Sequence, residues 1–110
     1  MSELLKRQQI FALNVSLLIQ KIFLDKYFCT LGEVYRPNEM AKIYAKEGKG
    51  ILDSQHCDKL AIDINLFSPG NVFLDKNDDH KRFGEYWETL HPQNRWGGRF
   101  SDGNHYEMKG

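Results

Sequence analysis

The segment SQHCDKLAIDINLF, residues 54–67, contains a clear strand pattern. Between positions 60 and 66, large apolar residues occupy every second position and alternate with small or polar ones. Successive side chains of a strand point to opposite faces, so this pattern predicts one buried face and one face that carries Asp63. The large apolar residues are Leu60, Ile62, Ile64 and Leu66. A carboxylate within such a strand, with His56 just ahead of it, needs a chemical explanation.

On the amino-terminal side of this strand, the pattern favours helices. Residues 2–28 contain neither Gly nor Pro, and Phe11, Val15, Leu18 and Ile22 recur at helical spacing. We expect a long amphipathic helix there, with this stripe in the core. Residues 30–37 are strand-like up to Pro37, and Asn38 can cap a second helix over residues 39–48. Its expected inner face consists of Met40, Ala41, Tyr44 and Ala45.

On the carboxy-terminal side, short elements are expected. SPGN, residues 68–71, predicts a turn, and residues 72–75 a short strand. Asp78 or Asp79 can start a helix whose apolar residues point inward, namely Phe83, Trp87 and Leu90. Residues 91–104 form a glycine-rich loop and residues 105–109 a closing strand. This order lacks a repeating βαβ pattern, so it predicts α+β architecture with helices on a small, mainly antiparallel sheet, in one domain over residues 1–110.

Composition excludes several classes of function. The formal net charge is zero, with 15 basic and 15 acidic residues spread along the chain, so nucleic acid is not an expected partner. The apolar run ALNVSLLIQKIFL, residues 12–24, is interrupted by polar residues, is too short to span a bilayer and lacks a cleavage site. We therefore expect a monomer made in the cytoplasm, without a signal peptide or a stable membrane anchor. Cys29 and Cys57 are expected to be reduced thiols.

A set of three residues has the chemistry of a catalytic zinc site, which takes three protein ligands and leaves a position for water. His56 precedes the central strand, Asp63 projects from its polar face, and His105 begins the last strand. If the two strands are neighbours, these side chains can converge. Asp102, in DGNH, could then face a metal-bound water as its base.

Simpler interpretations remain open for each of these residues. A histidine near a strand end often serves a structural hydrogen bond, Asp-Gly is a common turn, and Asp63 can lie on a solvated face. A second acidic cluster, Asp75, Asn77 and Asp79, mimics the start of a calcium loop. It lacks the required Gly and the bidentate Glu, and is interpreted as a helix cap.

Two ordered motifs resemble a known family. Ser54, His56, Ala61 and Asp63 fit S-x-H-x-x-G-x-A-x-D, and Asp102, His105 and Glu107 fit [DE]-x-x-H-x-E. These are the motifs of the zinc D-Ala-D-Ala carboxypeptidase and L-Ala-D-Glu peptidase family, and the chain resembles its small phage-endolysin branch. GEVYRPNEMA, residues 32–41, resembles the arginine segment of the family, and residues 84–107 resemble the block before the last zinc ligand. Lys59 stands where the first motif often has Gly.

The resemblance implies a role for each matched residue. Zn²⁺ would be bound by His56, Asp63 and His105, with Asp102 as general base. Arg36 would hold the substrate carbonyl and its developing oxyanion, with Ser54 and Trp96 as further substrate contacts. Glu107 would orient the His105 imidazole. The implied fold is the α+β one shared by the D-Ala-D-Ala metallopeptidases and the hedgehog signalling domain.

The expected function is therefore a zinc-dependent peptidase that hydrolyses an amide bond in the peptide stem or cross-link of bacterial peptidoglycan. As a phage or prophage lysis enzyme, it would act on the wall after release. Two alternatives stay open: a D,D-carboxypeptidase or dipeptidase that trims wall precursors, and a zinc-containing binding domain without turnover.

Overall fold

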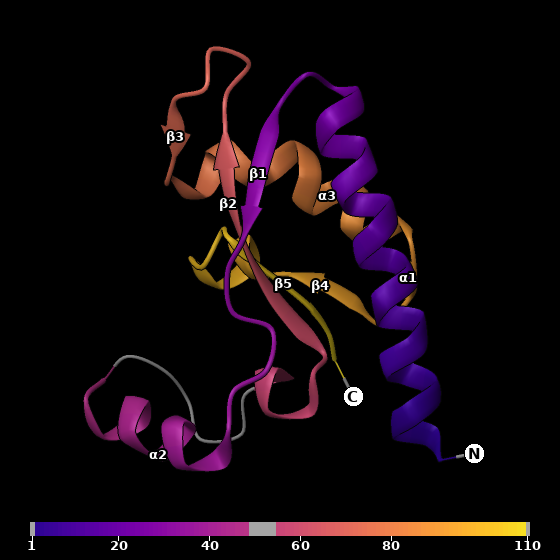
Figure 1. The fold of residues 1–110 in the computed structure, drawn as a ribbon, viewed down its shortest axis with the longest axis vertical. Coiled ribbons are helices and arrows are strands. Elements are labelled where there is room, and N and C mark those ends of the chain that lie inside the picture. The colour runs from indigo at the N-terminus through magenta and orange to yellow at the C-terminus, as the bar shows by residue number, and fades with distance from the viewer. Residues whose placement is uncertain (1, 49–54, 110) are drawn as a thin grey trace.

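The computed structural model describes the backbone of residues 2–48 and 55–109, and the side chains of these except at positions 38, 39, 41, 44, 55 and 56. In this part of the chain, helices pack on a five-stranded sheet whose strand pairs are all antiparallel. Figure 1 shows α1 along one side of the sheet and α2 set apart from the other elements. The predicted α+β class with a small antiparallel sheet is confirmed.

The first half of the chain forms α1 (Glu3–Leu24), β1 (Phe28–Leu31), α2 (Asn38–Lys46) and a 3-10 helix (Gln55–Asp58). The second half forms β2 (Ala61–Phe67), β3 (Phe73–Leu74), a 3-10 helix (Asn77–His80) that leads into α3 (Lys81–Thr89), β4 (Asn94–Trp96), a 3-10 helix (Gly97–Phe100) and β5 (His105–Met108).

Helix α1 begins where Ser2 accepts a hydrogen bond from the Leu5 N–H through its side-chain oxygen, at 3.1 Å, which is a typical N-cap. It ends four residues earlier than predicted: Lys26 has a φ of 71°, and Phe28 already begins β1. Among the described helices, none combines the length and the apolar character that a membrane span requires.

Strand β2 is the centre of the sheet, whose order is β1-β2-β5-β4. β1 pairs with one side of β2, while β5 and β3 pair with the other side, toward its two ends. The metal hypothesis required the strands that carry Asp63 and His105 to be neighbours. β2 and β5 are neighbours, and Asp63 lies directly opposite His105. Residues 91–104, predicted as a loop, contain β4 and a 3-10 helix.

The core lies where α1 and α3 meet one face of the sheet. Trp87 of α3 contacts Phe11 of α1 edge-on at 5.6 Å between ring centroids, and Tyr106 of β5 at 6.1 Å. The Trp87 indole N–H donates to the Glu107 carbonyl at 2.9 Å and so fixes α3 to β5. The fully buried apolar side chains on the two helices and the sheet include Leu18, Ile22, Ile64, Leu66, Phe83 and Met108. The predicted stripe of α1 and the predicted alternation of β2 both lie in this core.

Helix α2 differs from its prediction. Pro37, rather than Asn38, occupies the N-cap position and makes no side-chain capping bond. Ala45, predicted on an inner face, is exposed, and Met40 is only half-buried. The described part of α2 therefore has no buried apolar face against the core.

Candidate functional site

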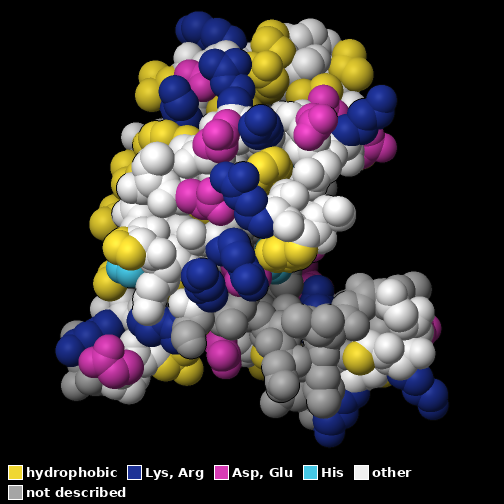
Figure 2. All heavy atoms as spheres, turned by 180° about the vertical axis from the view of Figure 1, so that it is seen from behind, with side chains coloured by type: hydrophobic (Ala, Val, Ile, Leu, Met, Phe, Trp, Pro, Cys, Tyr) yellow, Lys and Arg dark blue, Asp and Glu magenta, His cyan; other side chains and the backbone are white. Residues whose placement is uncertain are grey.

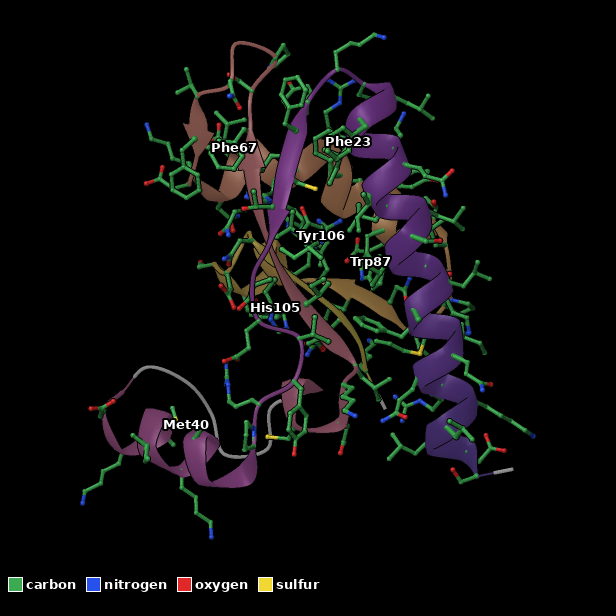
Figure 3. All side chains as sticks on the ribbon, in the orientation of Figure 1. Phe23, Met40, Phe67, Trp87, His105 and Tyr106 are labelled. Carbon is green, nitrogen blue, oxygen red and sulfur yellow. The ribbon has the colours of Figure 1, made fainter. Side chains whose placement is uncertain are left out.

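Asp63 and His105 face each other across β2 and β5. The odd-numbered residues of β5 point away from the core, which takes Tyr106 and Met108. In Figure 3, Tyr106 and Trp87 lie between the sheet and α1, whereas His105 lies apart from them, beside the segment that leads from β1 to α2. Nδ1 of His105 is 3.5 Å from Oδ1 of Asp63. The strand register thus places an imidazole nitrogen against a carboxylate.

Asp102 approaches the same ring nitrogen from the turn before β5. Its Oδ2 lies 3.9 Å from Nδ1 of His105, and its carbonyl accepts the His105 N–H at 3.0 Å. Gly97 fixes this turn, because its carbonyl accepts the Asp102 N–H at 2.8 Å and a Cβ at Gly97 would collide with the Asp102 carbonyl. The Asp102 side chain is 53% exposed, so its carboxylate can reach a bound molecule.

Glu107 holds the other nitrogen of the His105 ring. Its Oε1 lies 2.7 Å from Nε2 of His105, as expected for the residue that orients this imidazole. Its Oε2 accepts from Nη2 of Arg95 at 2.8 Å and from Nε of Arg95 at 3.2 Å. Arg95 was not predicted as a site residue. It lies opposite Glu107 in β4, and β4 was predicted as loop.

The electrostatics of this group follow from its burial and its charges. Burial lowers the pKa of His105, but hydrogen bonds with Asp63 and Glu107 and the charges of Glu107 and Asp102 outweigh this and raise the pKa to about 9. Burial likewise raises the pKa of Glu107, but hydrogen bonds from His105 and Arg95 hold it below its usual value. Three carboxylates around one ring therefore favour a positive charge at His105.

The donor set fits a zinc ion. One imidazole nitrogen faces two carboxylates while the other donates to a third carboxylate, which is how proteins hold a metal-ligating histidine. Of the three predicted ligands, Asp63 and His105 meet. His56 belongs to the 3-10 helix Gln55–Asp58 before β2, and its side chain lies outside the described residues. Among side chains that the structure describes, no three of His, Cys, Asp or Glu form a metal site by themselves.

Arg36 lies on the segment that runs beside Asp63. Glu33 of that segment accepts the Asp63 N–H through its carbonyl at 2.9 Å, and Gly32 donates its N–H to the Asp63 carbonyl at 2.8 Å. The guanidinium of Arg36 donates to Oε1 of Glu33 from Nη2 at 2.6 Å and from Nε at 2.7 Å. With 11% of its side chain exposed, Arg36 is held close to the sheet. Its contact with a substrate carbonyl stays a prediction.

Two further residues, Ser54 and Trp96, were predicted to contact the substrate. Ser54 lies outside the described residues. Trp96 is only 3% exposed and donates its indole N–H to the Gly103 carbonyl at 2.7 Å, so we assign it to packing instead of substrate contact. Phe100, which sequence reasoning did not select, is 44% exposed, and its ring lies edge-on to the His105 imidazole at 5.8 Å between centroids. The sequence marks Phe100 only as an aromatic residue within the glycine-rich segment.

Lys59, which stands where the motif often has glycine, has a backbone conformation that glycine favours. Its φ is 57°, in the left-handed region that glycine adopts at lowest cost. Its ammonium lies 5.3 Å from the centroid of the Tyr35 ring, which is a cation–π distance.

The second acidic cluster is a helix start, as interpreted. Oδ2 of Asp79 accepts the Lys76 N–H at 3.1 Å, and Asn77 donates its side-chain amide to the Gly98 carbonyl at 3.2 Å. The bond from Asn77 ties the segment before α3 to the 3-10 helix Gly97–Phe100, beside the candidate site.

No protein-family model matches the chain, and no curated protein is similar to it in sequence. Solved structures do share its fold. One is the crystal structure of the L-Ala D-Glu endopeptidase ChiX of Serratia marcescens, with a TM-score of 0.62 and 19% identity over 74% of this chain and 67% of that chain. The two chains share an α+β fold. At this identity the likeness concerns the fold, and it agrees with the fold that the motifs imply.

Proposed function

We propose that this chain is a zinc-dependent peptidase that hydrolyses an amide bond in the peptide stem or cross-link of bacterial peptidoglycan. The observation that carries this proposal is the convergence of Asp63 and Asp102 on Nδ1 of His105 while Glu107 holds Nε2. The substrate class is supported by the two motifs and by the fold shared with an L-Ala D-Glu endopeptidase.

His105, Asp63 and His56 would hold the zinc ion, with Nδ1 of His105 as its ligating nitrogen. When bound, zinc would polarise the scissile carbonyl and make water more acidic. The nitrogen and oxygen donors of the site suit this metal, and three protein ligands leave room for substrate.

Asp102 and Arg36 would supply the remaining chemistry. The half-exposed Asp102 carboxylate would take a proton from the attacking water and deliver it to the leaving amine. The Arg36 guanidinium would stabilise the negative charge that develops on the carbonyl oxygen. The exposed ring of Phe100 offers an apolar contact at the edge of the same site.

In biological terms, we propose a phage or prophage lysis enzyme that acts on the wall after release. A D,D-carboxypeptidase or dipeptidase acting on precursors and a zinc domain without turnover are the alternatives, and they differ in their products.

The test is digestion of purified peptidoglycan by the zinc-loaded protein and by a chelated sample, followed by mass spectrometry. The expected result is a set of new fragments, absent after chelation, whose free termini identify the bond. Intact peptidoglycan with zinc bound would contradict the lytic proposal. Soluble stem peptides in parallel would then separate a precursor-trimming enzyme, which shortens them, from a binding domain, which leaves them whole.

A further inference from the structure

Arg95 connects β4 to the buried carboxylate of β5. It lies opposite Glu107 in the register, and both Nη2 and Nε donate to the same oxygen, Oε2, at 2.8 Å and 3.2 Å. The Glu107 side chain is only 5% exposed, so this carboxylate depends on protein partners. Arg95 supplies the partner on one side.

The second oxygen of Glu107 is thereby directed toward His105. Oε1 lies 2.7 Å from Nε2 of His105, while Oε2 is held by the guanidinium. The last torsion of a Glu side chain is broad and weakly defined by itself. A guanidinium that fixes one oxygen therefore fixes where the other oxygen points.

Arg95 is itself held in place. Its guanidinium carbon lies 4.9 Å from the centroid of the Phe100 ring, and that ring lies edge-on to His105. Arg95 is thus confined by Glu107 and Phe100, although 42% of its side chain is exposed.

We propose that Arg95 is a positioning residue for His105. By fixing Glu107, it keeps Nε2–H of His105 bonded to Glu107 and turns Nδ1 toward Asp63 and Asp102. The role of a ring nitrogen is set by the hydrogen bond that the other nitrogen makes, which is how a remote arginine can act on a metal ligand. This inference rests on the proposed zinc site. Its rival is that Arg95 and Glu107 form only a cross-strand ion pair that stabilises the sheet.

Arg99 provides a matched control. It follows β4 by three positions, is 49% exposed, and makes the same kind of pair, with Nη2 donating to Oε1 of Glu88 at 2.6 Å. Its guanidinium lies over Trp96, at 5.5 Å, and not over Phe100. Arg99→Gln therefore removes a comparable charge pair without touching the Glu107–His105 contact.

The experiment compares the full-length wild-type, Arg95→Gln and Arg99→Gln proteins by two measurements. One is Zn²⁺ affinity, by competition with a chromophoric chelator. The other is the NMR signal of the His105 Nε2 proton, in histidine-labelled protein before and after zinc is added. Arg95→Gln should weaken zinc binding by about 10-fold and speed exchange of that proton, because partners of metal-ligating histidines typically change affinity about 10- to 100-fold. Arg99→Gln should change neither, and Arg95→Lys should recover part of both.

Unchanged affinity and proton exchange in Arg95→Gln would overturn the proposal, as would equal losses in Arg99→Gln. If Arg95→Gln does not fold, Arg95→Lys decides: wild-type values for both measurements would also overturn it. If the wild-type protein binds no zinc, the proposed function fails, and the Nε2 proton measured without metal still tests whether Arg95 positions His105.

Discussion

His105 is the residue through which the polar side chains of the sheet are connected. Its two ring nitrogens face Asp63 and Asp102 on one side and Glu107 on the other, and of these four side chains Asp102 is the most exposed, at 53%. A buried group of negative charges needs a compensating cation. A protonated imidazole or a metal ion bound by the imidazole can supply that charge, so the site suits a cation in either state.

His80 predicts a dependence of stability on acid. It is 1% exposed, its Nδ1 lies 2.8 Å from the Tyr106 hydroxyl, and burial lowers its pKa. The unfolded chain takes up this proton near pH ~6.5, whereas the folded protein resists it. Because the unfolded state then binds more protons, the free energy of unfolding should fall as pH drops below about 6.5.

The measurement is urea unfolding at several pH values between neutral and acid for wild-type and His80→Gln proteins. The difference in unfolding free energy between the two proteins should become smaller or reverse in acid. The wild type loses unfolding free energy as its unfolded state protonates His80, and the variant has no histidine there to protonate. A difference between wild-type and His80→Gln that stays constant with pH would contradict this prediction.

Sequence alone indicated some of these residues and not others, for physical reasons. Asp63, Asp102 and His105 could be selected because their residue types and spacing match zinc chemistry, and the structure places them together. Arg95 could not be selected, because its role depends on the pairing of β4 with β5. β4 has only three residues, which are too few to show a strand pattern in the sequence. The burial of Trp96 could not be predicted, because a tryptophan in a glycine-rich segment can be buried as easily as exposed, and only the packing decides.

At the level of elements, α3 and β4 depend on a glycine that helix propensity would disfavour. Gly84 lies within α3, and a Cβ there would collide with the Trp96 ring. Gly84→Ala gains about 1 kcal/mol of helix propensity. Overpacking against a buried ring typically costs about 1–3 kcal/mol, so the variant should have a lower unfolding free energy than the wild type.

The measurement is the urea midpoint of Gly84→Ala beside Glu85→Ala. Glu85 is the exposed neighbour on the same helix, and its replacement should change stability by less than about 0.5 kcal/mol. A Gly84→Ala protein more stable than wild type would mean that the Trp96 ring can move away at little cost.

Among the elements that the sequence predicted, those with a sustained period have the clearest pattern. α1 repeats its apolar stripe over several turns, and β2 alternates from Ile62 to Leu66, so both are evident from the chain. β4 is too short to show any period. The expected inner face of α2 had the right spacing, but the described part of this helix lies apart from the core, which no local pattern can indicate.

For the whole molecule, the two faces of the sheet differ in chemistry. One face carries the apolar residues that pack with α1 and α3, and the other carries Asp63, His105 and Glu107. Figure 2 shows the surface hollowed between α2 and the rest of the molecule, and Lys and Arg side chains interleaved with Asp and Glu down the middle of the face shown. The core thus holds the strands in register, and the register brings the ionisable groups together.

The most direct test compares wild-type and Asp102→Ala proteins at equal zinc content, by measuring the rate at which new amino termini appear in peptidoglycan. Asp102 contributes its backbone to the turn and only its half-exposed carboxylate to the chemistry, so Asp102→Ala should fold and bind zinc. Its rate should fall by about 10²- to 10⁴-fold, as expected for loss of a general base. Equal rates for the two zinc-loaded proteins, or no new termini with either, would contradict this prediction.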